Sequence, residues 1–429
     1  MFLGINRRSA GLRGRRWRAG ELTRQDVPLF RRFFDHMKTI RVPFGFRSFG
    51  AALALAGLQF SPAVLPCAYA EDQGQAKAKF FDWENLQSDV AGVADRTDPN
   101  VVNAWGLVIN PTAKVFWVND NGAGVSTLFG PDGTPVLLGP SPGQNFVMLP
   151  PTAVDTGSPH TAAPTGIVFN SSPNAFLIPN TKNPAIFIFD GEDGGIWGWN
   201  PQVNLLNATL IVKPSSPDPM TNNVFKGLAI ANRSSGPALY ATNFRAGKVF
   251  VFDSSFKLVA QFADPNPPLP VPEGTAGWAP FGIANIDGLL YVTFAAQNDV
   301  KHDDLAAPGR GFVDVFSPEG VLLKQLIIGG NLNSPWGLAK VPKQFGKFED
   351  DVLLVGNFGD GHINAYNIES SPAVLIESLS RRAGQPLEFN GLWGLFFFQD
   401  KLYFTAGIVD EAHGLFGFIH SQESENSDQ

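Results

Sequence analysis

Asparagine and aspartate side chains recur in this 429-residue sequence just after short apolar segments. Carboxylate and amide oxygens are the ligands that a hard cation such as Ca²⁺ prefers, and they also bind polar small molecules. Calcium is therefore the cofactor that these residues favour, if they converge, with Asp120, Asp299 and Asp360 as candidate metal ligands. The full set of candidate ligand-binding residues is Asn119, Asp120, Asn121, Asn243, Asn298, Asp299, His302, Asp303, Asp304, Asn357 and Asp360.

The same residues also have a purely structural interpretation. Asn and Asp hydrogen-bond their own backbone in turns, so each residue taken alone is better explained as a turn former. Basic neighbours such as Arg245, Lys301 and Arg310 could balance the carboxylates, and a polar ring would then be architecture. The segment 190–199 raises a similar question, because its carboxylates and two tryptophans either bind a sugar or cation or form a turn that packs.

Signatures of common catalytic chemistry are missing. The sequence has no H-E-x-x-H, P-loop, G-x-G-x-x-G or EF-hand pattern. Its G-x-S-x-G match, Gly139–Gly143, contains two prolines and cannot form the strand, sharp turn and helix which that motif requires. The histidines after residue 70 are not spaced as zinc ligands.

A repeat organises the chain from about residue 100 onward. Its centre is a glycine followed by a short apolar segment, and in four of the six repeats an aromatic residue precedes the glycine. The spacings between successive glycines are 60, 61, 55, 55 and 57 residues. The glycines are Gly106, Gly166, Gly227, Gly282, Gly337 and Gly394. So even a period indicates repeated supersecondary units.

Each repeat predicts four short strands, because apolar residues recur at period two or in short runs and never at helical spacing. Four strands per repeat are typical of a propeller blade. We expect the glycine to admit a neighbouring backbone near the axis, and the preceding aromatic residue to wedge between adjacent blades. The last repeat supplies only three strands, so Lys79–Leu86 is the predicted fourth, paired with Leu415–Ile419.

The sequence therefore predicts an all-β fold, a six-bladed β-propeller of four-stranded blades closed by an N-terminal strand. The propeller is expected over residues 71–420, between an N-terminal extension, 1–70, and a disordered polar tail, 421–429. Loops that join second and third strands should gather on one face, which we expect to be the functional face. A monomer is expected.

The extension has the features of a signal peptide over residues 37–70. A basic segment after Met37 precedes an apolar stretch too short to span a membrane and an Ala-Tyr-Ala site, so cleavage is expected after Ala70. Translation is then expected to start at Met37, and residues 1–36 are not expected to form a domain. The single cysteine, Cys67, lies inside the signal, and a lipoprotein-type cleavage there is disfavoured by Pro66. The predicted location is secreted or periplasmic, with no transmembrane segment.

Charge excludes one class of partner. Without residues 1–70 the chain has 20 Lys and Arg against 36 Asp and Glu, a net charge of −16. Such a surface repels nucleic acid and anionic membranes. A small molecule, a glycan or a protein remains as the expected partner.

The repeat resembles the NHL type, and residues 79–420 resemble an uncharacterised bacterial family of secreted six-bladed propellers. The matching stretches are Asn103–Gly106, Thr165–Asn170, Glu192–Pro201, Gly311–Phe316 and Asn357–Gly361. This resemblance implies the fold and secretion but no activity. A looser similarity to lactonase-type propellers implies a divalent metal at the channel mouth with Glu, Asn and Asp ligands.

Two functions follow as expectations. The first is a non-catalytic binding or recognition module, which an apolar plug in the channel would favour. The alternative is a metal-dependent, calcium-type lactonase or esterase-like hydrolase. A Glu or Asp beside two Asn at the channel mouth would favour that hydrolase.

Overall fold

The computed structural model describes residues 79–140, 142–153 and 161–423. The predicted signal peptide, its cleavage site and residues 424–429 lie outside these ranges. Strands and turns make up the described part of the chain, and none of it forms a helix long and apolar enough to span a membrane.

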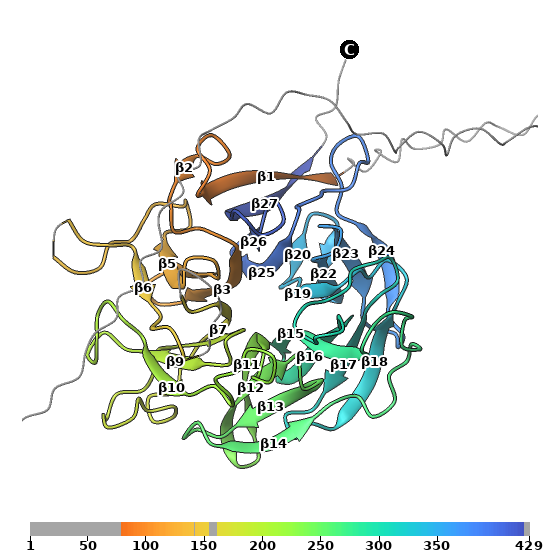
Figure 1. Ribbon diagram of the computed structural model, residues 1–429. Helices are drawn as coiled ribbons and strands as arrows, with labels where there is room; N and C mark the ends of the chain where they lie inside the picture. The colour runs from red at the N-terminus through yellow and green to blue at the C-terminus, as the bar shows by residue number, and fades with distance from the viewer. Residues whose placement is uncertain (1–78, 141, 154–160, 424–429) are drawn as a thin grey trace, which may run out of the picture. The chain divides into compact units, whose positions relative to one another are not determined.

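The strands form six blades arranged in a ring (Figure 1). Blade 1 consists of β3 (Ala104–Asn110), β4 (Val115–Asp120), β5 (Val125–Phe129) and β6 (Phe146–Met148). Blade 2 consists of β7 (Pro164–Phe169), β8 (Phe187–Gly191), β9 (Ile196–Trp199) and β10 (Thr209–Val212). Blade 3 consists of β11 (Phe225–Arg233), β12 (Gly236–Asn243), β13 (Lys248–Phe252) and β14 (Leu258–Phe262).

The other three blades follow the same order from the axis outward. Blade 4 consists of β15 (Trp278–Ile286), β16 (Leu289–Ala296), β17 (Phe312–Phe316) and β18 (Leu322–Ile328). Blade 5 consists of β19 (Pro335–Lys340), β22 (Val352–Asn357), β23 (Ile363–Asn367) and β24 (Val374–Ser378), with a hairpin of β20 (Gln344–Phe345) and β21 (Phe348–Glu349). Blade 6 consists of β25 (Leu392–Phe398), β26 (Lys401–Ala406), β27 (Leu415–Glu423) and β1 (Lys79–Ser88), with β2 (Arg96–Thr97) at its edge.

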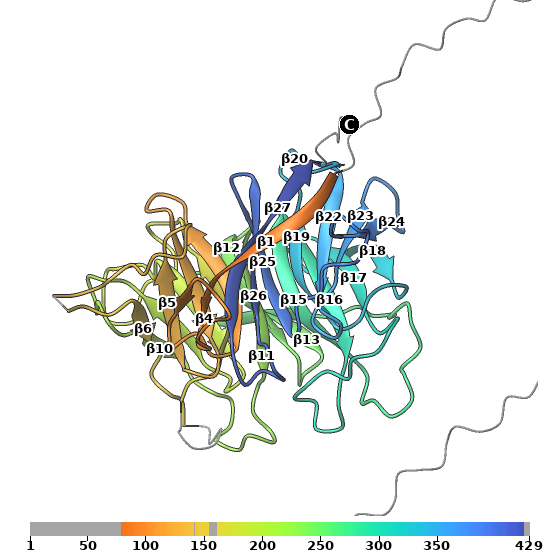
Figure 2. The ribbon, with the colours of Figure 1, turned by 90° about the horizontal axis from the view of Figure 1, so that it is seen from above.

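An N-terminal strand completes the last blade. β1 pairs antiparallel with β27, with Trp83 opposite Ile419 and Ser88 opposite Leu415, and both views show the two strands side by side (Figures 1 and 2). The predicted closure is therefore confirmed. β27 continues to Glu423, so residues 421–423 belong to this strand and not to the expected polar tail.

The repeat glycines lie where innermost strands of adjacent blades approach each other. A Cβ atom on Gly106 would lie 2.2 Å from the carbonyl oxygen of Thr165, and one on Gly282 would lie 2.1 Å from that of Trp336. No real Cβ atom can be so close to a backbone oxygen. Crowding between innermost strands, the predicted reason for the repeated glycine, is confirmed.

Apolar residues fill six cores, one between each pair of adjacent blades, and a seventh core lies on the axis. Innermost strands also touch in sequence around the ring, from β3 through β25 and back to β3. The axial core contains Trp105, Phe281, Trp336 and Trp393, which precede four of the repeat glycines. The expectation that these aromatic residues wedge between blades is therefore wrong: they meet at the centre of the ring.

Candidate functional site

The aromatic residues on the axis close the central channel. The rings of Trp105 and Trp393 stack with centroids 3.5 Å apart, and Trp336 lies 6.3 Å from Trp105 at a steep angle. Phe358, after β22, stacks on Trp393 at 4.1 Å. Because these rings come from blades 1, 5 and 6, they can contact one another only near the axis. We call Trp105, Phe281, Trp336, Phe358 and Trp393 the axial plug.

Lys226 occupies the position before the repeat glycine in blade 3, where blades 1, 4, 5 and 6 have aromatic residues. Its ammonium group forms an ion pair with Glu192 and lies 3.5 Å from an oxygen of Asp303. It also lies 5.3 Å from the centroid of the Trp105 ring. The lysine side chain is only 3% exposed. A charged group is thus buried directly on the axial plug.

The protonation of Lys226 follows from its neighbours. Burial alone would lower the pKa of Lys226, but the charges of Glu192 and Asp303 outweigh burial, and the pKa is raised above its ordinary value. The side chain is therefore an ammonium ion at neutral pH. It cannot act as an amine nucleophile, because only the neutral amine is nucleophilic.

Glu411 is a second, half-buried, titratable residue beside the plug. Its Oε2 atom accepts a hydrogen bond of 2.7 Å from Asn103 Nδ2, and Asn103 Oδ1 accepts one of 3.0 Å from Trp393 Nε1. Burial, and next the charge of Glu192, raise the pKa of Glu411 to about 7. This carboxyl group therefore changes its charge in the neutral pH range.

The remaining polar contacts join Glu192 and Asp303 to the loops. Asn121 Nδ2 donates to Glu192 Oε2 at 3.0 Å, and His302 Nδ1 lies 2.6 Å from Asp303 Oδ1. Desolvation raises the pKa of Asp303, but the contact with His302 and the charge of Lys226 outweigh it and hold that pKa below its ordinary value. The Lys226 cluster, as we name it, comprises Asn103, Asn121, Glu192, Lys226, His302, Asp303 and Glu411.

Four loops carry most of this cluster. Asn121 follows β4, Glu192 follows β8, His302 and Asp303 follow β16, and Glu411 follows β26. Each of these loops joins the second and third strands of its blade. The polar side chains thus converge on one face of the ring, beside the axis.

The structure brings together Asn121, His302 and Asp303 of the candidate residues, with Asn298 supporting them. Asn298 Oδ1 accepts a hydrogen bond of 3.0 Å from the backbone of His302, and its Nδ2 lies 3.3 Å from Asp303 Oδ2. Asp304 follows in the same loop, and burial raises its pKa.

Other candidate residues have local structural partners. Asn119 is buried and donates to the carbonyl oxygens of Thr165 and Gly166 in the next blade. Asn243 accepts from the backbone of Ala246, as a turn former does. Asn357 donates to Asp360 at 3.0 Å.

The three candidate metal ligands are not brought together. Asp120 is buried and accepts from the Thr127 backbone, Asp299 is exposed, and Asp360 accepts from Asn333 and Asn357. Among the described residues, the side chains of Glu192, His302 and Asp303 form a group of possible metal ligands, with ligand atoms all within 4.8 Å of one another. Asp120, Asp299 and Asp360 form no such group.

Sequence reasoning missed Lys226, Glu411 and Asn103. Lys226 was detectable as a charged residue at a repeat position held mostly by aromatic residues. Arg245 and Arg310, the expected counter-charges, instead donate to backbone carbonyls. In the segment 190–199, Trp197 and Trp199 are buried in the core between blades 1 and 2, as the packing alternative predicted.

Comparisons with known proteins give relatives without an assigned activity. No protein-family model matches the chain. Two uncharacterized proteins of Acanthamoeba polyphaga mimivirus are similar to it, one 28% identical over 343 residues, covering 78% of each chain. The other is 27% identical over 335 residues, covering 76% of this chain and 82% of the relative. These relatives are viral, so they do not support the bacterial and secreted character that the resemblance implies.

Two solved structures are similar to this chain at low sequence identity. A catalytically inactive virginiamycin B lyase from Staphylococcus aureus, solved with quinupristin, is 12% identical, with a TM-score of 0.41 over 80% of this chain and 99% of that chain. A protein of unknown function from Bacteroides thetaiotaomicron is 9% identical, with a TM-score of 0.46 over 81% of this chain and 77% of that chain.

Proposed function

We propose that the protein is a non-catalytic binding module that takes the cationic group of a small molecule at the Lys226 cluster. The observation that carries this proposal is a charge imbalance. Three carboxyl groups, from Glu192, Asp303 and Glu411, surround one ammonium group at the axis. Phe358, half-buried in the plug, adds an aromatic ring, and a ligand ammonium ion is attracted to such a face.

Binding is favoured over catalysis by the plug and by Lys226. Stacked rings close the channel beneath the cluster, so a ligand would rest on the plug and could not pass through. The lysine is held as an ammonium ion and supplies no nucleophile. What remains at the mouth is a negative, partly aromatic surface of the kind that recognises amines.

The raised pKa of Glu411 gives this proposal a pH signature. A cation that binds beside Glu411 favours the charged form of this carboxyl group. At a pH where Glu411 is protonated in the free protein, binding therefore releases a proton. Affinity should therefore rise with pH up to and through about 7, the pKa of free Glu411, and level off above it.

Calorimetric titration with n-butylammonium at pH 6, 7 and 8 tests the proposal, with n-butanol as the uncharged control. We expect saturable binding of the amine alone, stronger at pH 8 than at pH 6. Glu411→Gln should weaken it about tenfold, the scale of a lost charge-assisted hydrogen bond, and should abolish the pH dependence. Glu349→Gln, at an exposed site in β21, is the matched control. Equal affinity for amine and alcohol would rule the proposal out.

A metal-dependent hydrolase is the second candidate, favoured by the grouping of Glu192, His302 and Asp303. A metal ion there has to compete with the ammonium group of Lys226, which already pairs with Glu192. Elemental analysis of the purified protein, followed by a lactone and ester panel with and without chelator, tests this candidate. Stoichiometric calcium and chelator-sensitive hydrolysis would establish it, and their joint absence would eliminate it.

We also propose export from the cell, because the basic and apolar segments before Ala70 have the pattern of a signal peptide. N-terminal sequencing of the protein recovered outside the cytoplasm tests this. A mature protein that begins at Glu71 supports export with the expected cleavage, whereas retention of residues 1–36 would refute it.

A further inference from the structure

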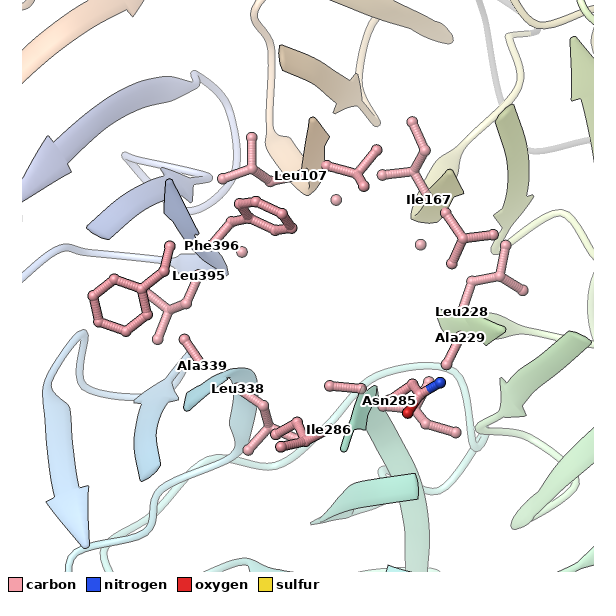
Figure 3. A pocket seen from close by; sticks show the side chains of 18 of the residues that line it. Leu107, Ile167, Leu228, Ala229, Asn285, Ile286, Leu338, Ala339, Leu395 and Phe396 are labelled. Atoms are coloured by element: carbon pink, nitrogen blue, oxygen red, sulfur yellow. The ribbon is translucent and has the colours of Figure 1, made fainter. Parts of the chain in front are cut away.

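A cavity of about 540 Å³ occupies the channel on the other side of the axial plug (Figure 3). All six innermost strands line it, and the labelled side chains surround an open centre. Trp336 is the plug residue that lines it. The repeat glycines Gly106, Gly166 and Gly394 line the cavity at the same end as Trp336. The cavity is therefore a cup with its floor at the plug.

The chemistry of the walls defines what the cup can bind. Side chains from every blade are mainly aliphatic or aromatic, among them Leu107, Leu228, Leu338 and Phe396. Each innermost strand pairs with one neighbour only, so the N–H and C=O groups of its second edge take no part in a sheet ladder, although some of them bond side chains, as the Ile230 carbonyl does with Asn285. A ligand can thus bury apolar surface and also make a few hydrogen bonds.

Charge narrows the class of ligand further. Among the described lining residues the charged ones are Asp287 and Lys340, and they form an ion pair of 2.6 Å near the rim. An ion in the cup would lose its hydration without gaining a free counter-charge, which is costly. A neutral molecule does not meet this penalty.

We infer that this cup is a second binding site, for an uncharged and mainly apolar small molecule that carries a hydroxyl or carbonyl group. Its volume lies within the range of about 300–1,000 Å³ that is usual for small-molecule sites. The site lies beyond the plug from the Lys226 cluster and does not depend on the function proposed there.

Trp336 supplies a direct signal of occupancy. Trp336 lines the cavity, and its Nε1 atom donates a hydrogen bond of 2.8 Å to the carbonyl oxygen of Lys226. A ligand in the cavity changes the surroundings of this residue, which is only partly buried. Its fluorescence should therefore respond to binding.

The experiment uses 1-adamantanol as the probe and adamantane-1-carboxylate as its charged counterpart. We expect calorimetry to find saturable binding of the alcohol, and binding of the carboxylate at least tenfold weaker. Ala229→Phe and Ala339→Phe enlarge two lining residues labelled in Figure 3 and should weaken binding of the alcohol at least tenfold. Val259→Phe, on the outermost strand of blade 3, is the matched control.

A second readout covers the case in which the filled variants do not fold, as judged by thermal melting. In Trp336→Phe the fluorescence change caused by 1-adamantanol should disappear, because the indole that reports binding is removed. A fluorescence change that survives this substitution would overturn the inference. So would an absence of binding to the unaltered protein, or undiminished binding to a folded Ala339→Phe variant.

Discussion

The ammonium nitrogen of Lys226, in blade 3, lies 5.3 Å from the centroid of the Trp105 ring, in blade 1. These blades are not neighbours, so the contact crosses the axis. It joins two repeat positions that would be equivalent in a symmetric ring, one aromatic and one charged. The buried ammonium group thus lies against an aromatic ring of a distant blade, and its removal should lower the stability of contacts between several blades.

Lys226→Met should destabilise the protein by about 3–5 kcal/mol, the cost of breaking a buried ion pair by removing one partner. The loss leaves Glu192 and Asp303 without their counter-charge. Adding Glu192→Gln to Lys226→Met should restore part of the stability, as measured by urea unfolding. Lys347→Met removes an exposed ion pair with Glu377 and should cost less than about 1 kcal/mol. Equal losses in the two lysine variants would contradict this assignment.

Alanine substitution of the repeat glycines should have graded effects. A Cβ atom at Gly282 would lie 2.1 Å from a backbone oxygen, whereas a Cβ atom at Gly227 would lie 3.1 Å from the nearest atom. We expect Gly282→Ala to lower the melting temperature strongly or prevent folding, and Gly227→Ala to lower it modestly. Similar melting of the two variants would show that crowding does not explain the glycines.

Asp314 should make stability depend on pH. It is fully buried in β17, and burial, followed by the charge of Asp264, raises its pKa to about 8. The folded state therefore keeps the proton from about pH 4, where an unfolded aspartate ionises, up to about pH 8. Because the folded state binds more protons in this range, stability should fall as pH rises through it.

Asp314→Asn should flatten this decline by up to about 1.4 kcal/mol per pH unit, as measured by urea unfolding at pH 5 and pH 8. Part of the slope should remain, since burial also raises the pKa of Asp190 to about 7. Asp350→Asn, at an exposed position, should leave the slope as it is. An unchanged slope in Asp314→Asn would refute the prediction.

The closing strand offers a test within two adjacent residues. Phe81 is buried and stacks on Phe345 with centroids 4.9 Å apart, while Phe80 on the other side of β1 is only partly buried. Phe81→Ala should cost about 3–5 kcal/mol, and Phe80→Ala much less. Deletion of residues 79–86 should lower the melting temperature further. A deletion variant that melts like the intact protein would argue against closure through β1.

The fold was readable from the sequence because its main constraint recurs. The innermost strands approach each other closely at the repeat glycine, and a Cβ atom would be too close to a neighbouring atom at five of the six positions, so Gly106 and its five equivalents mark the period directly. The last repeat contains only three predicted strands, so an earlier strand was expected to complete its blade, and β1 does so. Strand lengths were less readable, because the pairing of residues 421–423 depends on their partner in β1.

The site was readable only in part, because side-chain direction is not visible in the sequence. Asn119 and Asn121 are two residues apart, yet one bridges blades 1 and 2 and the other reaches Glu192. Lys226 departs from the repeat, and the features that the repeats share do not single it out. In the last blade the loop carries positive φ angles at Val409, Asp410 and Glu411, and the Glu411 side chain reaches Asn103 beside the axis.

Closure through β1 also sets the order of events when the chain is made. The Ser88 hydroxyl donates to the carbonyl oxygen of Gly414, a residue 326 positions later in the chain. At about 5–20 residues per second, β1 waits on the order of tens of seconds before its partner leaves the ribosome. During that time β1 is an unpaired strand open to other chains. Assembly of the ring therefore ends with its earliest strand, and a helper that shields nascent β1 would raise the yield of folded protein.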